Sequence, residues 1–445
     1  MTAPALVPEP LAPREAAGRR LLGVSYSFPP LHNAQSLLVE RTVRALSGMG
    51  WQVTMLTVNP GSTMEPVDDA LTERIPRAVE VVRTASLERR LFAAPPSLER
   101  ILRHSLHFCG LPEKQFPWYF SACRAGRRLL GARRFDIIHS WACYHTSNVV
   151  GLALKRWSGL PLVAHFSDPW VDNPFHFLWP LQRAVCRRLE AAVIREADAV
   201  VFVTEQAAAK VMAKYPAAWR QKVHVIPHGY DSAVPARAPA RAPKGAQRLR
   251  LTYAGSFYGP RNPEAFLRAL ARLGRGRALE QELAVVLCGP GVPRYAALAR
   301  SLELQRIVEC RGPLGFDEAR QAMAEADVLL VIDAPSEGPS LFLASKVVDY
   351  LAFGKPILGL TPAEGATADL LGRLGGPVAP PDDEGAIAAA IAEILGLWRR
   401  GVLRIAPEFA QVARAYEGRA TAGRLDSLLA SLARGAAVSG LERMR

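Results

Sequence analysis

The feature that most constrains the fold is a repeated alternation of short apolar runs with helical patterns, interrupted once by a segment that has neither. The apolar runs are continuous instead of alternating with polar residues, which is typical of parallel strands covered on both faces. The sequence therefore predicts doubly wound α/β sheets. The predicted strands are residues 20–27, 52–58, 135–139, 161–166, 198–203 and 223–226, then 249–254, 283–288, 307–310, 327–332 and 356–360.

The interruption divides the chain into two predicted domains. Residues 232–248 are rich in Pro, Ala and basic residues and carry no strand pattern, as expected of a linker. At 445 residues the chain is also too long for one ordinary core. We expect two tandem Rossmann-like doubly wound domains with a cleft between them. The predicted order is a disordered tail (1–20), a first domain (21–231), the linker (232–248), a second domain (249–407), a helix packing back on the first domain (408–434) and a tail (435–445).

Composition excludes several classes of protein. The sequence contains no run of about 18 apolar residues, so it predicts no transmembrane helix. Residues 1–20 lack the apolar core of a signal peptide. The six cysteines form no C-x-x-C pair, and the nine histidines show no zinc spacing. We expect a cytoplasmic protein with reduced thiols and no metal site.

Positive charge is concentrated in one segment. The chain has a formal net charge of +14, and residues 83–134 hold 11 Lys/Arg against 3 Asp/Glu, which gives 11 − 3 = +8. The same segment contains the aromatic stretch 116–120. A solvated pair of basic helices and contact with an anionic membrane surface or substrate both fit this pattern. No nucleic-acid recognition motif accompanies the charge, so we expect no nucleic-acid partner.

The stretch 340–356, SLFLASKVVDYLAFGKP, carries a lysine and an acid on one helical face. Ser345 is the predicted N-cap of a helix over 346–353, and Gly354 fits a left-handed C-terminal position. A cation at a helix N-terminus is normally unfavourable, so Lys346 indicates a bound anion. Asp349, one turn later, could accept hydrogen bonds from a ribose diol. The alternative is an ordinary surface ion pair between Lys346 and Asp349.

Two other strand ends of the second half are rich in glycine. Gly255 and Ser256 follow a predicted strand, and Arg261 comes just before the next helix, where its guanidinium could grip a phosphate. Gly289 follows the next strand, where a plain turn and a nucleotide contact fit equally well. Arg261 as an ordinary surface residue is the alternative at the first of these strand ends.

Ionisable and aromatic residues follow strands of the first half. His165, Asp168 and Trp170 come at the end of the strand at 161–166, which indicates a site. Asp168 could instead be a turn former ahead of Pro169. His32 and Asn33 lie in the proline-fixed loop after the first strand and are predicted to overhang the cleft.

In sum, the chain resembles the glycosyltransferases of GT-B fold over about residues 20–430, and it is most similar to family 4, the retaining, nucleotide-sugar-dependent group. The resemblance rests on the order and spacing of six motifs. They are the FPP loop at 28–30, DIIHSW at 136–141, SDPW at 167–170, VIPHGYD at 225–231, YAGSFYGPRN at 253–262 and SKVVDYLAFGKPI at 345–357.

The resemblance implies a transfer of a sugar from a nucleoside-diphosphate sugar to an acceptor hydroxyl with retention. Arg261 and Lys346 would hold the diphosphate and Asp349 the ribose, with no metal and no cofactor beyond the donor. The acceptor would be a glycan or lipid-linked, in surface polysaccharide or glycolipid synthesis on the inner face of the cytoplasmic membrane. The implied donor-binding residues are Gly255, Ser256, Arg261, Gly289, Glu337, Ser345, Lys346 and Asp349; the catalytic ones are Asp168 and His165, and the acceptor-side ones are His32, Asn33 and Trp170.

The chain departs from the family pattern in several places. Asn33 and Ala34 replace the glycines of the first loop, and Ser167 stands where a histidine is common. The first acid of the family's E-x(7)-E pair falls on Leu341 without a gap, or on Glu337 with a short insertion. Two other functions stay open at this point. They are a nucleotide-sugar epimerase of GT-B fold, and a non-catalytic module whose basic segment binds membrane or nucleic acid.

Overall fold

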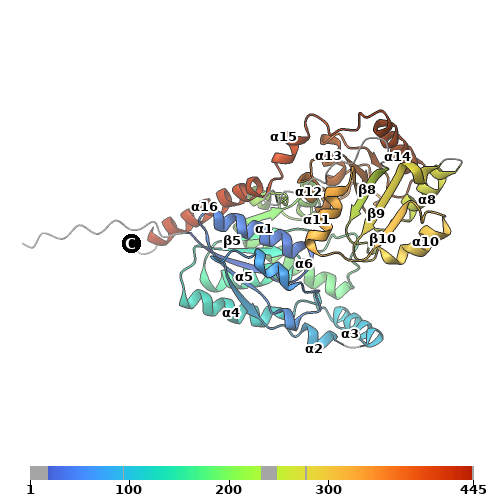
Figure 1. Cartoon of the computed structure of the whole chain (residues 1–445). Helices are drawn as coiled ribbons and strands as arrows, with labels where there is room; N and C mark the ends of the chain where they lie inside the picture. Colours follow the sequence, from blue (N-terminus) through green and yellow to red (C-terminus); the bar gives the residue numbers. More distant parts are fainter. Residues whose placement is uncertain (1–18, 94, 232–247, 276–277, 443–445) are drawn as a thin grey trace, which may run out of the picture.

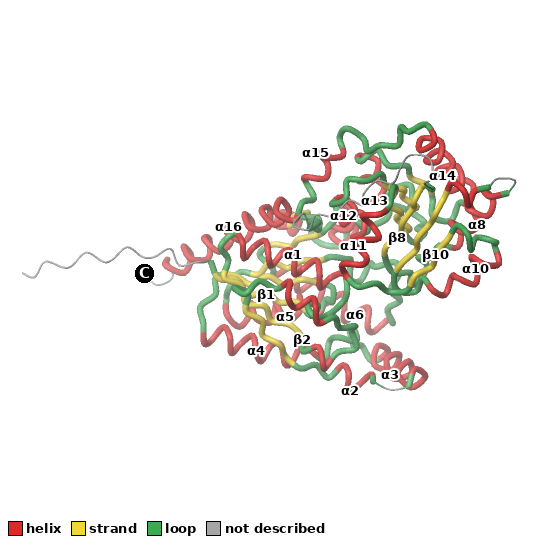
Figure 2. Tube along the Cα trace, viewed as in Figure 1, coloured by secondary structure: helices red, strands yellow, loops and turns green. Residues whose placement is uncertain are grey.

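The computed structural model describes residues 19–93, 95–231, 248–275 and 278–442. Within them the chain forms two parallel α/β sheets, of seven and six strands, with helices packed on them (Figures 1 and 2). The strand orders are β3-β2-β1-β4-β5-β6-β7 and β10-β9-β8-β11-β12-β13. This arrangement confirms the predicted pair of Rossmann-like doubly wound domains.

Every strand of the first sheet precedes residue 226, and every strand of the second follows residue 248. The first sheet contains β1 (Arg20–Ser25), β2 (Gln52–Val58), β3 (Glu80–Thr84), β4 (Ile137–Ala142), β5 (Leu162–Phe166), β6 (Ala199–Phe202) and β7 (Val223–Val225). The second contains β8 (Leu249–Ala254), β9 (Leu283–Cys288), β10 (Val308–Arg311), β11 (Val328–Ile332), β12 (Ile357–Leu360) and β13 (Val378–Ala379).

Helices alternate with these strands along the chain. In the first half they are α1 (Ala34–Gly48), α2 (Glu88–Phe92), α3 (Pro96–Phe108), α4 (Trp118–Ala132), α5 (Thr146–Ser158), α6 (Pro180–Glu196) and α7 (Glu205–Met212). In the second half they are α8 (Glu264–Gly274), α9 (Leu279–Glu282), α10 (Ala296–Ser301), α11 (Phe316–Glu325), α12 (Ser345–Leu351), α13 (Ala366–Arg373), α14 (Glu384–Arg399), α15 (Phe409–Arg414) and α16 (Gly418–Glu442).

Each sheet is buried on both faces, as its continuous apolar strands require. In β1, neighbouring residues Leu21 and Leu22 belong to different core clusters, one on each face of the first sheet. In β11, Leu329 and Leu330 divide in the same way between the two clusters of the second sheet. In a sheet of this kind, ligands bind at the carboxyl edge where the strand order reverses. These points lie between β1 and β4 in the first sheet and between β8 and β11 in the second.

The chain returns to the first domain at its end. The predicted single helix over 408–434 is wrong, because α15 and α16 are separate. The chain between them instead pairs with the end of the first domain. Tyr230 donates its N–H to the Tyr416 carbonyl and accepts from the N–H of Gly418. A Cβ on Gly229 would lie 2.5 Å from the Cα of Gly418, so the two crossing segments touch through glycine.

After this crossing, α16 runs along α1, as the red and blue helices of Figure 1 show. Leu425 and Leu429 of α16 join the core cluster that contains Val39 and Val43 of α1. The predicted return of the last helix to the first domain is therefore observed. Helix α16 continues to Glu442, into the segment expected to be a tail.

Several expectations fall outside the described residues. These are the tail up to residue 18, the linker apart from Arg248, and residues 443–445. Among the helices that the structure describes, none is both long and apolar enough to cross a membrane.

Candidate active site

The reversal point of the second sheet brings together an arginine and an acid. Arg261 lies in the loop between β8 and α8, and Asp333 directly follows β11. Nη2 of Arg261 donates to Oδ1 of Asp333 at 3.1 Å. The other carboxylate oxygen of Asp333 accepts from the hydroxyl of Thr361 at 3.2 Å. Asp333 is buried and therefore holds the guanidinium at the carboxyl edge of the sheet.

Lys346 extends from α12 across the end of β8. A Cβ on Gly255 would lie 1.6 Å from Cε and 2.5 Å from Nζ of Lys346, so only glycine leaves room for this side chain. The amine lies 5.1 Å from the centre of the Tyr253 ring. Within the described residues it makes no hydrogen bond or ion pair. Burial and the nearby charge of Arg261 lower the pKa of Lys346 to about 7. An unpaired, partly desolvated cation beside a second cation is an arrangement that a bound anion would stabilise.

The start of α12 differs from the prediction by one residue. Ala344 is the N-cap, and its N–H donates to the hydroxyl of Thr367 at 3.0 Å. Ser345 is thus the first helical residue and Lys346 the second, and Ala344 makes no side-chain capping bond to the first turn. The helix ends at Leu351, before the predicted 353, and Gly354 has the expected left-handed conformation, with φ of +57°.

Asp349 pairs with the first domain and stays partly exposed. Its Oδ1 accepts from Nη1 of Arg41 on α1 at 2.5 Å. The alternative, a surface ion pair between Lys346 and Asp349, does not form among the described contacts, and Asp349 pairs instead with an arginine of the first domain.

The other predicted donor-side residues have varied positions. Gly289 has φ of +129°, and a Cβ there would lie 2.2 Å from the Gly255 carbonyl oxygen, so it lets two strand-end loops touch. The carbonyl of Ser256 accepts from the Tyr253 hydroxyl at 3.0 Å. Glu337 is exposed in the loop between β11 and α12.

Asp168 and His165 lie at the end of β5 in the first domain. Desolvation raises the pKa of Asp168 to about 6, and the charge of Arg261 opposes this rise. Asp168 of the first domain is therefore within the electrostatic reach of Arg261 of the second. His165 is buried between His139 and His228, with ring centres 6.0 Å and 5.6 Å away. Burial lowers the pKa of His165 well below its usual value, so its imidazole is neutral.

The predicted acceptor-side residues serve mainly the local fold. Asn33 caps α1 by accepting from the N–H of Ser36, and its amide donates to Glu65 at 3.1 Å. His32 donates its N–H to the Pro66 carbonyl. Trp170 is 4% exposed and stacks on His145 at 4.7 Å between ring centres. Of these, His32 and Asn33 remain partly accessible, whereas Trp170 supports the β5 loop from inside the core.

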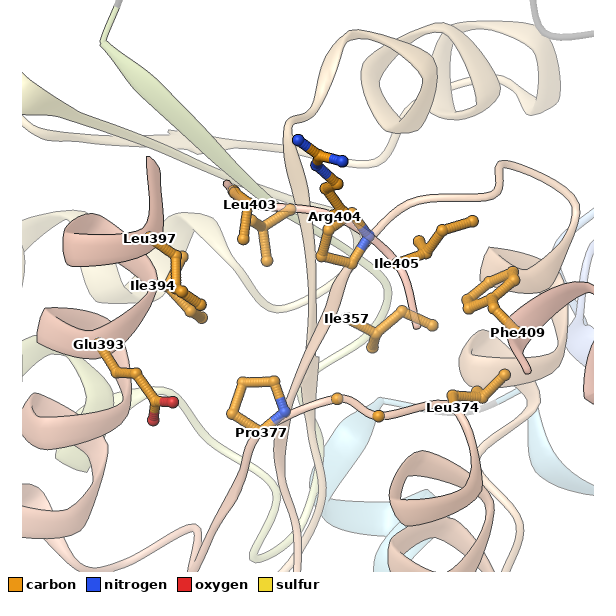
Figure 3. A pocket seen from close by; sticks show the side chains of 14 residues that line it. Ile357, Leu374, Pro377, Glu393, Ile394, Leu397, Leu403, Arg404, Ile405 and Phe409 are labelled. Carbon is orange, nitrogen blue, oxygen red and sulfur yellow. The ribbon is translucent and has the colours of Figure 1, made fainter. Parts of the chain in front are cut away.

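The cavity in Figure 3 is not at this site. It has a volume of about 390 Å³ and is lined by Val328 and Ile357, the first residues of β11 and β12 (Figure 3). Those residues mark the amino edge of the sheet, opposite Lys346. A second cavity of about 320 Å³ lies between the domains, bordered by Thr204, Leu343 and Tyr416.

Comparison with known proteins identifies the fold and the family. The model of the family described as Glycosyltransferase Family 4 matches residues 35–234, and that of Glycosyl transferases group 1 matches residues 248–396. The two matches meet at the predicted linker and together span most of the chain. The chain belongs to the GT-B glycosyltransferases. No curated protein is a significant match to the whole sequence of this glycosyltransferase.

Solved glycosyltransferase structures share the fold of this glycosyltransferase over nearly its whole length. Sucrose-phosphate synthase from Thermosynechococcus elongatus has a TM-score of 0.66 at 19% identity, covering 93% of this chain and 99% of that chain. HepE from Anabaena, in complex with UDP and glucose, has a TM-score of 0.61 at 16% identity, covering 93% and 100%. WaaG, a glycosyltransferase involved in lipopolysaccharide biosynthesis, has a TM-score of 0.59 at 15% identity, covering 92% and 99%.

Proposed function

We propose that this glycosyltransferase moves a sugar from a nucleoside-diphosphate sugar to an acceptor hydroxyl, with retention, in the synthesis of a surface polysaccharide or glycolipid. The observation that carries the proposal is the pair of cations at the reversal point of the second sheet. Arg261 is held there by Asp333, and the amine of Lys346 lies over the Tyr253 ring without a hydrogen bond or ion pair among the described residues. The solved structure of HepE contains UDP and glucose, and WaaG acts in lipopolysaccharide biosynthesis, which supports both halves of the proposal.

The chemistry follows from where charge develops. When the sugar leaves, negative charge accumulates on the diphosphate, and fixed cations at that position stabilise the transition state more than the ground state. Arg261 and Lys346 would supply these charges, so the mechanism needs no metal. Asp349 would accept hydrogen bonds from the ribose. Asp168 would take the proton of the acceptor hydroxyl, and His165 is the second candidate at the same strand end.

A donor screen followed by product analysis tests the proposed function. One nucleotide sugar from a panel of UDP- and GDP-sugars should stabilise the protein by about 2.7 kcal/mol at roughly 100 times its dissociation constant. With an acceptor hydroxyl present, NMR of the product should show a new glycosidic bond with the donor's anomeric configuration. An epimerised sugar released without acceptor, or no response to any donor, would overturn the proposal.

The shifted pKa values of Asp168 and Lys346 predict a bell-shaped pH dependence of kcat/KM. Asp168 must lose its proton to act as a base, so kcat/KM should rise with pH through about 6. Lys346 must keep its proton to hold the diphosphate, so kcat/KM should fall as pH rises through about 7. The rising limb should disappear in Asp168→Asn and the falling limb in Lys346→Arg. Limbs that persist in both variants would show that other groups titrate.

We also propose that the first domain docks on an anionic membrane surface at the inner face of the cytoplasmic membrane. Leu98, Ile101 and Phe108 lie along one face of α3 and are all exposed, and the same helix carries Arg100 and Arg103. Exposed apolar side chains on a helix that also carries arginines suit the interface of an anionic bilayer. The helix projects from the rest of the first domain (Figure 1).

This apolar face continues toward the cleft through residues that the sequence did not single out. Phe108 and Phe177 both pack edge-on against Trp179, at 5.6 Å and 5.3 Å between ring centres. Phe175 stacks on Phe342 of the second domain at 5.3 Å. A lipid-linked acceptor held in the membrane could therefore reach the cleft along the segment that starts at Asp168.

Vesicle flotation tests the membrane proposal. Phe108→Ser combined with Phe177→Ser should weaken binding to phosphatidylglycerol vesicles by about tenfold or more, because each buried Phe contributes about 1.5–3 kcal/mol. Activity on a water-soluble acceptor should change little. Val402→Ser, at an exposed apolar position of the second half of the chain, is the control. Equal flotation of the double variant and the wild type would contradict the proposal.

A further inference from the structure

Asp349, the proposed ribose-binding acid, is held by a residue of the opposite domain. Arg41 on α1 donates through Nη1 to Oδ1 of Asp349 on α12. The side chain of Arg41 is 7% exposed, whereas that of Asp349 is 35% exposed. The arginine is thus fixed in the interior, whereas the carboxylate is partly exposed to solvent.

The contacts of Arg41 leave it little freedom. Nη1 also lies 3.4 Å from the Gly229 carbonyl oxygen, next to the point where the two crossing segments touch. Its Nε is buried and has no hydrogen-bond partner among the described residues. An unsatisfied N–H on a buried guanidinium costs free energy of folding. Stability alone therefore does not explain why an arginine lies here.

The two carboxylate oxygens of Asp349 have different surroundings. Oδ1 accepts from Arg41, and Oδ2 accepts no hydrogen bond from the described residues. A carboxylate can accept from several donors at once, so Oδ2 remains available to the hydroxyls of a ribose. The pairing also fixes the orientation of the Asp349 side chain.

We propose that Arg41 is a positioning residue for the donor nucleotide, which orients Asp349 so that its free oxygen recognises the ribose diol. The inference rests on the proposed function, because it assumes that Asp349 meets a ribonucleotide. It goes further by making the first domain part of the donor site. Ribose recognition then depends on the two domains being in contact.

Discrimination between ribose and deoxyribose tests this role. The probes are UDP and 2′-deoxy-UDP, and GDP and 2′-deoxy-GDP, with dissociation constants measured by calorimetry. The wild type should prefer the ribose form of one base, and Arg41→Gln should weaken binding of that form on the order of tenfold. The same variant should bind the deoxy form almost as the wild type does, so that the preference is lost. Arg41→Lys, which keeps the charge, should retain part of it.

A neighbouring arginine supplies the control. Arg74 pairs with Glu40 and Asp231 and lies over the ring of Phe316 in the second domain, without contacting Asp349. Arg74→Gln should therefore leave the preference for ribose intact. Melting temperatures of all variants establish whether each is folded.

The outcomes separate the two proposals. Equal weakening of both forms in Arg41→Gln would mean that Arg41 is merely structural. Tighter binding of UDP or GDP would mean that Arg41 competes with the ribose for Asp349. Either result overturns the positioning role while leaving the proposed function intact. A wild type that binds none of the four probes would overturn the proposed function and this inference with it.

Discussion

Lys346→Ala is expected to lower kcat/KM for sugar transfer by about 10³-fold, the upper range for losing one preorganised group that stabilises a developing anion. The protein should stay folded, because the amine makes no hydrogen bond or ion pair with the described residues. Removing a partly desolvated cation next to Arg261 should even stabilise the free protein slightly. Activity and thermal stability would thus change in opposite directions.

Steady-state kinetics and thermal melts, measured side by side, check this prediction. Lys210→Ala is the matched control, since Lys210 is exposed on α7. It should match the wild type in both measurements. Wild-type activity in Lys346→Ala would remove Lys346 from the donor site.

Gly255→Ala is expected to reproduce the catalytic defect of Lys346→Ala although the lysine itself is not substituted. The added methyl group would lie 1.6 Å from Cε of Lys346. The lysine side chain is flexible, so the clash is relieved by moving the amine away from the end of β8 instead of by moving the backbone. We expect kcat/KM to fall by about 10²- to 10³-fold, as for loss of the charge itself.

The double variant makes this prediction specific. Two substitutions that remove one interaction are not additive, so Gly255→Ala combined with Lys346→Ala should be no less active than Lys346→Ala alone. Gly423→Ala, at a position in α16 where a Cβ would meet nothing within 4 Å, is the control for the added methyl group itself. Additive losses in the double variant would show that Gly255 acts independently of Lys346.

Much of the fold could be predicted because its strands are buried on both faces. Continuous apolar runs gave β2, β8 and β9 with their observed bounds. The edge strands β3 and β13 were missed, since β3 has no fully buried residue and β13 is only two residues long. The break between α15 and α16 was also missed. It depends on backbone pairing with Tyr230, which is remote in the sequence.

The site was predictable where chemistry and strand ends coincide. Arg261 and Lys346 were expected at strand ends of the second sheet, where Arg261 lies beside Asp333 and Lys346 beside Gly255; their roles stay a prediction. Asp333 was overlooked, although an acid directly after the apolar run at 328–332 is a visible signal. Arg41 gave no such signal, because it lies inside an ordinary amphipathic helix and its partner Asp349 is 308 residues away. Contacts that form only when two domains meet have no local pattern in the sequence.

A crystal structure with a bound nucleoside diphosphate would test the central claim most directly. Phosphate oxygens should lie about 2.7–3.1 Å from Nζ of Lys346 and from the guanidinium of Arg261, at the carboxyl ends of β8 and β11. A diphosphate bound elsewhere, with the amine of Lys346 turned to solvent, would contradict the account.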